Sequence, residues 1–164
     1  MKRHLLVSVA LLMLVSHLAM AADSPAAQAF ERMKALAGEW RGTMSDGKPI
    51  SMSLAVTSGS SVLMQTDHTN DMMTMFHLNG DRLMLTHYCD MGDQPRMVSK
   101  VSPDGKTISF DFLDITNLPS PDTPYMRRLV VVITDSDHFS EQWFAHTKQG
   151  KEVGDTFTLT RKGK

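Results

Sequence analysis

Short runs of alternating apolar and polar residues follow one another from Glu39 to the end of the chain. Such alternation places successive side chains on opposite faces of a strand, and it is typical of half-buried β-strands. Turn residues separate the runs about every 8 to 12 positions, as in antiparallel sandwiches and barrels. We expect ten strands, near residues 39–44, 49–56, 61–67, 72–78, 81–89, 96–101, 106–115, 125–133, 138–146 and 152–161.

The connections between these runs indicate a closed sheet. Most are short and contain Gly, Pro, Asn or Asp, as at Asp46-Gly47 and Asn79-Gly80. No segment after residue 38 has the length and helical periodicity needed to join parallel strands. Hairpin-linked strands leave two exposed edges unless the first and last strands pair. The pattern therefore predicts an all-β fold, a ten-stranded up-and-down antiparallel β-barrel, which at this strand number encloses a small cavity.

One helix is expected before the strands. Ser24 followed by Pro25 is a favourable helix start, and Gly38 follows the last apolar position of the stripe. The apolar stripe between them contains Ala26, Ala29, Phe30, Met33, Leu36 and Ala37. This spacing predicts one short N-terminal amphipathic helix, which would cover an open end of the barrel.

The first 21 residues have the composition of a secretory signal peptide. Lys2-Arg3 is a basic start, residues 5–15 form an apolar run too short to span a bilayer, and Ala19-Met20-Ala21 is a small-residue cleavage site. We expect cleavage after Ala21, a periplasmic or secreted protein, and a single domain over residues 22–164. No other stretch is apolar enough for a membrane helix, so no membrane insertion is expected after cleavage.

Charge and cysteine content narrow the expected partners. The chain has 17 basic and 18 acidic residues, a net charge of −1 with histidine neutral, and it has no basic stripe. This argues against a nucleic-acid ligand. Cys89 is the single cysteine, so it has no intramolecular disulfide partner, and it lies too far from residue 21 to carry a lipid.

The clearest hairpin lies within residues 72–89, with Asn79-Gly80 as a two-residue turn. One face of this hairpin is then apolar with a single imidazole, that of His87. A bulged three-residue turn would shift the register by one and exchange the faces on one strand. With the two-residue turn, the expected pairs are Phe76 with Leu83, Thr74 with Leu85, and Met72 with His87.

His87 is the candidate site residue on this inward face. A neutral imidazole there can ligate a metal or haem, or donate to a ligand carboxylate, and the alternative is a core histidine bonded to a neighbour. Cys89 shares the face, but side chains two residues apart on a strand are about 7 Å apart, too far for the imidazole to activate the thiol. No catalytic motif appears elsewhere in the sequence, so no catalysis is expected.

Methionine is frequent around this hairpin. Soft thioethers and imidazole can bind Cu(I), which makes His87 with Met72 or His77 a candidate copper site. Methionine is also a common filler of cores and adaptable cavities, and alternation places these residues on both faces. Core or cavity lining is therefore the other reading of the group formed by Met72, Met73, Met75, Met84, Met91 and Met97.

Two long connections, residues 90–95 and 116–124, are expected at the same end of an up-and-down barrel. Arg96 and Arg127 follow them and could approach each other at this rim, with Gln94 and Asn117 nearby. Paired guanidinium groups can bind a carboxylate or phosphate, although exposed arginines without a ligand would look the same in sequence. Glu141 shares the face of Trp143 and could pair with one of these arginines.

Gly38-Glu39-Trp40 on the first strand and Arg161 on the last resemble the calycin superfamily, the lipocalins and fatty-acid-binding proteins. In that superfamily the arginine packs across the tryptophan and closes the barrel base. A guanidinium over an indole ring contributes about 0.5 to 2 kcal/mol. The resemblance implies structural roles for Gly38, Trp40 and Arg161.

Several segments also resemble a family of small exported bacterial lipocalin-like domains without an assigned activity. This resemblance implies fold and export, and it implies no chemistry. Nitrobindin, a haem-binding barrel of the same shape, has its iron-ligating histidine near the C-terminus, whereas residues 154–160 contain no histidine. The segments that carry the resemblance are residues 77–83, 85–89, 94–97, 117–118 and 141–143.

Together these patterns predict an exported protein that binds a small apolar or amphiphilic molecule, with an anionic end if the arginines take part. Haem or copper binding through His87 is one alternative, and a structural or partner-binding barrel with a packed interior is another. No cofactor is expected under the first hypothesis. The candidate ligand-binding residues are His87, Tyr88, Cys89, Met72, Phe76, Leu85, Gln94, Arg96, Asn117, Arg127, Glu141 and Trp143.

Overall fold

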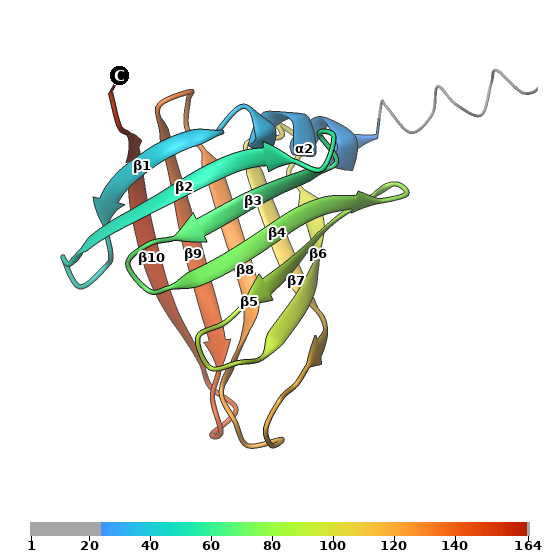
Figure 1. Cartoon of the computed structure of the whole chain (residues 1–164). Coiled ribbons are helices and arrows are strands. Elements are labelled where there is room, and N and C mark those ends of the chain that lie inside the picture. Colours follow the sequence, from blue (N-terminus) through green and yellow to red (C-terminus); the bar gives the residue numbers. More distant parts are fainter. Residues whose placement is uncertain (1–23, 164) are drawn as a thin grey trace, which may run out of the picture.

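Ten antiparallel strands form a closed barrel in the computed structural model, which describes residues 24–163 (Figure 1). Each strand pairs with its neighbours in sequence, and the first pairs with the last. The strands are β1 (Gly38–Thr43), β2 (Pro49–Thr57), β3 (Val62–Asp67), β4 (Met72–Asn79), β5 (Arg82–Tyr88), β6 (Gln94–Val101), β7 (Thr107–Thr116), β8 (Tyr125–Ile133), β9 (His138–His146) and β10 (Glu152–Arg161).

The predicted fold class is confirmed. Residues 24–163 form an up-and-down barrel of ten strands with one short helix before them, and the seam joins β1 to β10 with Trp40 opposite Arg161. The expected strand bounds agree with the observed ones to within two residues. The largest difference is at the start of β6, which begins at Gln94 and not at residue 96.

Helix α2 (Pro25–Lys34) lies across one end of the barrel (Figure 1). Ser24 caps it, since its side chain accepts a hydrogen bond from the Ala27 backbone N–H at 3.1 Å. The predicted apolar stripe faces the barrel, and Phe30 and Met33 are buried there. The helix therefore closes the end at which β1 begins and β4 turns into β5.

The packed core lies behind this helix. The indole N–H of Trp40 donates to the Leu36 carbonyl at 2.8 Å, and its ring meets Phe139 edge to face at 4.6 Å between centroids. The guanidinium carbon of Arg161 is 4.4 Å from the centre of the Trp40 ring, and Nη1 of Arg161 donates to the Ala37 carbonyl. The core also contains the fully buried side chains of Met52, Leu63, Phe76, Leu83, Leu85, Met97, Ile108, Phe110 and Leu129.

The register of the β4–β5 hairpin differs from the prediction by two residues. The structure pairs Phe76 with Leu85 and Thr74 with His87, so the expected pairs are wrong. The reason is the position of the turn, because Asn79 stays in the ladder opposite Arg82 and the two loop residues are Gly80, with φ +62°, and Asp81. A shift of two preserves the alternation, so the predicted inward face is retained.

The predicted signal peptide, residues 1–21 with cleavage after Ala21, lies outside the described residues. Within residues 24–163, α2 is the one helix assigned, and it has neither the length nor the apolar character that crossing a membrane requires.

Candidate functional site

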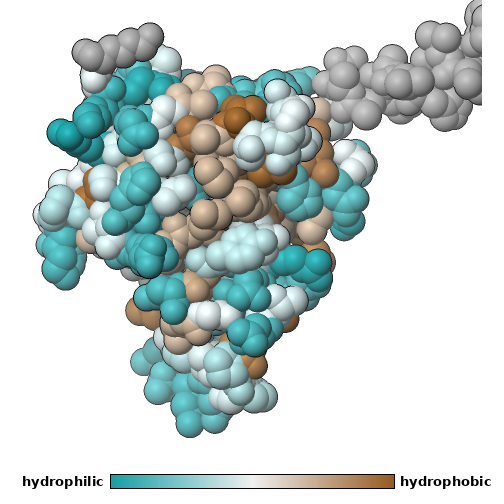
Figure 2. Space-filling view, in the orientation of Figure 1, coloured by the Kyte–Doolittle hydropathy of each residue, from teal (hydrophilic) through white to brown (hydrophobic). Residues whose placement is uncertain are grey.

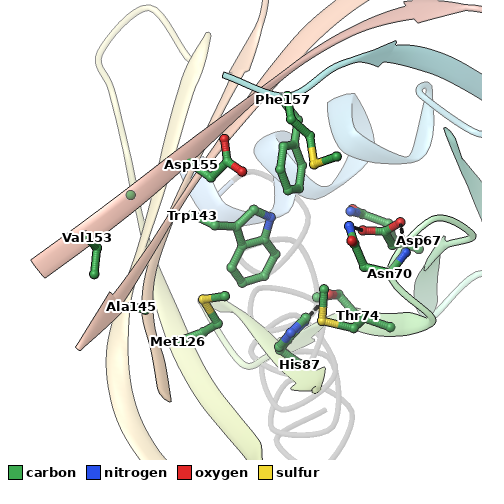
Figure 3. A pocket seen from close by; sticks show the side chains of 14 residues that line it. Asp67, Asn70, Thr74, His87, Met126, Trp143, Ala145, Val153, Asp155 and Phe157 are labelled. Atoms are coloured by element: carbon green, nitrogen blue, oxygen red, sulfur yellow. Dashed lines mark hydrogen bonds between the residues drawn. The ribbon is translucent and has the colours of Figure 1, made fainter. Parts of the chain in front are cut away.

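A cavity of about 350 Å³ opens at the end of the barrel opposite α2. Its walls come from the ends of β3 to β5 on one side and of β8 to β10 on the other (Figure 3). A barrel with a fully packed interior, one of the predicted alternatives, does not agree with this space. The lining residues are Met44, Gln65, Asp67, Asn70, Met72, Thr74, His87, Met126, Trp143, Ala145, Val153, Gly154, Asp155 and Phe157.

His87 is the most constrained polar group of the first wall. It is 3% exposed, and its Nδ1 lies 2.9 Å from the Thr74 hydroxyl, while its Nε2 is buried without a hydrogen-bond partner among residues 24–163. Burial lowers the pKa of His87 from its ordinary value of 6.5 to about 4, against smaller opposing effects of Asp67 and Asp90. The imidazole is therefore neutral at pH 7 and has a free nitrogen at the cavity.

Glu141 joins the two walls across the interior. Its Oε2 accepts hydrogen bonds from the indole N–H of Trp143 at 2.9 Å and from Nε2 of Gln65 at 3.0 Å. Burial raises the pKa of Glu141 from 4.5 to about 7, although these two bonds oppose the rise. The arrangement holds the Trp143 ring beside His87, with 4.7 Å between the ring centroids, and leaves the Oε1 atom of Gln65 buried without a partner within the described part of the chain.

The contributions of His87 and Glu141 to the folding stability are expected to change with pH in opposite directions. Between pH 4.5 and 6.5 the unfolded chain protonates His87 and the folded chain does not, so this residue makes stability rise with pH. In the same window only the folded chain keeps the proton of Glu141, so that residue makes stability fall with pH. The two contributions largely cancel in the wild type.

Single substitutions separate these contributions. As the pH rises from 4.5 to 6.5, the free energy of unfolding of His87→Gln is expected to fall by about 2 kcal/mol relative to that of the wild type. That of Glu141→Gln is expected to rise by about as much relative to the wild type. Urea unfolding at pH 4.5, 5.5 and 6.5 measures this, and the comparison removes the titration of surface carboxylates common to all three proteins. Parallel stability curves for the three proteins would show that neither pKa is displaced.

Two carboxylates lie at the mouth of the cavity. Asp67 is 7% exposed and accepts hydrogen bonds from the backbone N–H groups of Thr69 and Asn70 and from the Asn70 side chain. Asp155 accepts from Ser45 and from the Thr156 backbone N–H, in each case at Oδ1. Among the described residues, neither carboxylate forms an ion pair, and no Lys or Arg lines the cavity.

The predicted site residues that point into the barrel fall into three groups. Met72, His87 and Trp143 line the cavity. Phe76 and Leu85 also point inward, but they are fully buried in the packed core. Glu141 lies beneath the cavity through its bonds to Gln65 and Trp143.

Tyr88 and Cys89 lie away from the cavity. Tyr88 is 46% exposed on the outer face. Cys89 follows β5 half-buried, with its Sγ donating to Asp90 at 3.4 Å. Burial is the main cause that raises the pKa of the Cys89 thiol to about 11, so the group is a thiol at pH 7.

The predicted arginines do not converge at the cavity. Arg96 forms an ion pair with Asp114 on the outer surface, and Arg127 lines a separate polar hollow outside the barrel. The two long connections that precede these arginines, residues 90–95 and 116–124, do meet. The side chains of Asn117 and Gln94 both donate to the Gly92 carbonyl, at 2.6 and 2.7 Å. The structure therefore brings the loops together and leaves the cavity without a cation.

The methionines occupy both faces of the hairpin, as alternation predicts. Met72 lines the cavity, whereas the half-buried Met73 and Met75 contribute to the apolar outer surface over β3 to β5 (Figure 2). His77 also points outward, with its Nδ1 3.2 Å from the Leu78 carbonyl. His87 and His77 therefore lie on opposite sides of the sheet, and the predicted metal pair of these two histidines is wrong.

Three polar residues of the cavity, Gln65, Asp67 and Asp155, are not among the predicted site residues. Alternation along residues 61–67 nevertheless places Gln65 and Asp67 on the same face as the apolar Leu63. A polar side chain at an inward strand position is the signal that identifies them. Asp155 lacks such a signal because β10 is exposed along its first residues.

Comparison with known proteins adds information about the fold alone. No family model and no curated protein matches the chain. A solved structure with a TM-score above 0.5 shares the fold. Rv2717c from M. tuberculosis is 17% identical, with a TM-score of 0.53 over 82% of this chain and 98% of that one. A protein with unknown function from the DUF3598 family of Nostoc punctiforme is also 17% identical, with a TM-score of 0.49 over 78% of this chain and 48% of that one.

Proposed function

We propose that the barrel binds a small, largely apolar molecule in the cavity beside His87 and Trp143, without chemical conversion. The observation that supports this is an apolar space with two buried polar atoms, His87 Nε2 and Gln65 Oε1, that have no partner among residues 24–163. Each unsatisfied buried group costs about 1 to 3 kcal/mol, which a ligand with matching polar atoms would recover.

The size of the space limits the ligand. A volume of about 350 Å³ lies at the small end of the range of ligand pockets, about 300 to 1,000 Å³. It suits a compact molecule of one to three rings better than a long acyl chain. The thioethers of Met72 and Met126 can adapt to the outline of such a body.

We further propose that binding takes place outside the cytoplasm. The basic, apolar and small-residue pattern of residues 1–21 supports export, with residues 22–164 as the mature lipocalin-like domain. Mass spectrometry of the protein from its own host, with a mature N-terminus at Ala22, would test this.

Binding of a neutral fluorescent probe tests the proposed function. N-phenyl-1-naphthylamine is expected to bind the purified protein saturably, with a blue-shifted emission that reports an apolar site. Ala145→Phe places a ring in the cavity and is expected to raise the Kd at least tenfold, about 1.4 kcal/mol. The control is Ala55→Phe on the exposed side of β2, which should leave the Kd unchanged. Absence of saturable binding, or equal binding by both variants, would contradict the proposal.

Haem or Cu(I) binding is the second candidate, and the free Nε2 of His87 is the observation that favours it. When Nδ1–H donates to Thr74, the Nε2 lone pair is available to a metal, and Met72 lines the same cavity. No group of three His, Cys, Asp or Glu residues suited to a metal ion occurs within residues 24–163. A haemin titration without a Soret shift, together with no Cu(I) uptake, would eliminate this candidate.

A further inference from the structure

The cavity offers hydrogen-bond acceptors and few donors. Three of its side-chain donors are already used, since Gln65 Nε2 and the Trp143 indole bond to Glu141 and the Asn70 amide bonds to Asp67, which leaves the Thr74 hydroxyl beside His87 as the other side-chain donor. Gln65 Oε1 has no donor within the described residues, although the side chain is only 4% exposed. A ligand that fits this surface must therefore bring N–H or O–H groups.

The charges of the lining have one sign. Asp67 and Asp155 are its charged residues, and neither forms an ion pair in the part of the chain that the structure describes. Lys48 is paired with Asp46 and acts on Asp155 only at longer range. The three bonds to Asp155 end on Oδ1, so Oδ2 has no donor from residues 24–163. Asp67 reaches the interior electrostatically, because its charge acts to raise the pKa of both His87 and Glu141. An anionic ligand would be repelled here and a cationic one attracted.

Two aromatic rings complete the lining. Trp143 and Phe157 border the space between the carboxylates (Figure 3). The basic side chains that stack on rings in the described structure use Phe30, Phe144 and Trp40, so the rings at the cavity are not used in this way. Indole and phenyl faces attract cations, by about 0.5 to 2 kcal/mol depending on desolvation.

We propose that the ligand of this cavity is an amphiphilic organic cation, a primary or secondary ammonium on a compact aromatic or aliphatic body. This inference rests on the proposed binding function and assigns its ligand class. The ammonium contacts Oδ2 of Asp155 and the aromatic faces, Gln65 Oε1 accepts one of its N–H groups, and Asp67 adds a longer-range attraction. His87 Nε2 serves as a further acceptor in the tautomer whose Nδ1–H donates to Thr74.

Three probes that share one naphthyl body test the ligand class. They are 1-naphthylmethylamine, 1-naphthalenemethanol and 1-naphthoate, which carry an ammonium, a hydroxyl and a carboxylate at pH 7. Isothermal titration at pH 7 and low salt is expected to give at least tenfold tighter binding for the amine than for the alcohol. The carboxylate should bind at least tenfold more weakly than the alcohol.

A matched pair of variants locates the charge contact. Asp155→Asn is expected to weaken binding of the amine about tenfold and to leave binding of the alcohol within twofold. Asp81→Asn is the control, because Asp81 lies in the exposed β4–β5 turn at the α2 end of the barrel. It should change neither affinity.

The outcomes separate this inference from the proposed function. Equal affinities for amine and alcohol, tightest binding of the carboxylate, or an unchanged amine affinity in Asp155→Asn would overturn the cation assignment while leaving the cavity as a binding site. Failure of all three naphthyl probes and of neutral N-phenyl-1-naphthylamine to bind would overturn both. If Asp155→Asn does not fold, the ranking of the three probes on the wild type still decides the question.

Discussion

Gly42→Ala is expected to destabilise the protein by more than about 4 kcal/mol, a loss few single substitutions reach. Gly42 lies in the seam, opposite Leu159 in β10, and a Cβ there would be 1.9 Å from the Thr158 carbonyl oxygen. Because the neighbouring atom belongs to the backbone, the two strands must separate and the barrel must open. Urea unfolding at 25 °C measures the loss.

Gly163→Ala is the control for this substitution. A Cβ at Gly163 meets no heavy atom within 4 Å, so we expect a change below about 0.5 kcal/mol. A Gly42→Ala protein within about 1 kcal/mol of the wild type would show that the seam has more room than this backbone arrangement gives it.

Trp40→Ala should have the second largest effect, about 3 to 5 kcal/mol. The side chain is 1% exposed, and its removal leaves a cavity beside Phe139. The substitution removes the hydrogen bond from the indole N–H to the Leu36 carbonyl, which links β1 to the segment that follows α2. It also removes the ring beneath Arg161. The measurement is the free energy of unfolding from urea titration.

Trp40→Phe refines this result, since it keeps an aromatic ring and loses the indole N–H. Its cost should be about 1 to 2 kcal/mol, and its affinity for N-phenyl-1-naphthylamine should equal that of the wild type, because Trp40 lies at the α2 end. Weaker probe binding in a folded Trp40→Phe protein would mean that the two ends of the barrel are coupled.

Strand positions and faces follow from local pattern, whereas the register of the hairpin does not. Alternation along residues 72–88 assigns His87 to the inside, and burial confirms it. The segment Asn79-Gly80-Asp81 contains residues that suit either of two adjacent turns. A slip of two residues buries the same side chains, so the hydrophobic pattern cannot distinguish the predicted pair of Met72 and His87 from the observed pair of Thr74 and His87.

The sequence pattern predicts the interior residues of the candidate site but not the residues at its mouth. An imidazole or indole among apolar inward positions, as at His87 and Trp143, stands out in sequence. Where the interior ends and the mouth begins depends on strand tilt and closure, which local pattern does not contain. Asp67 and Asp155 therefore resembled surface acids, while Arg96, expected at the rim, is paired with Asp114 outside.

The hydrogen bonds of Glu141 with Gln65 and Trp143 have a consequence for the use of this barrel as a scaffold. They form a partition across the lumen between β3 and β9, with the helix-capped core on one side and the open chamber on the other. The partition is not complete, because Trp143 and Phe157, which line the chamber, belong to the same hydrophobic cluster as Trp40. Wall residues outside this cluster, such as Ala145 and Val153, are thus the positions that can be redesigned for new ligands while the capped half maintains the fold.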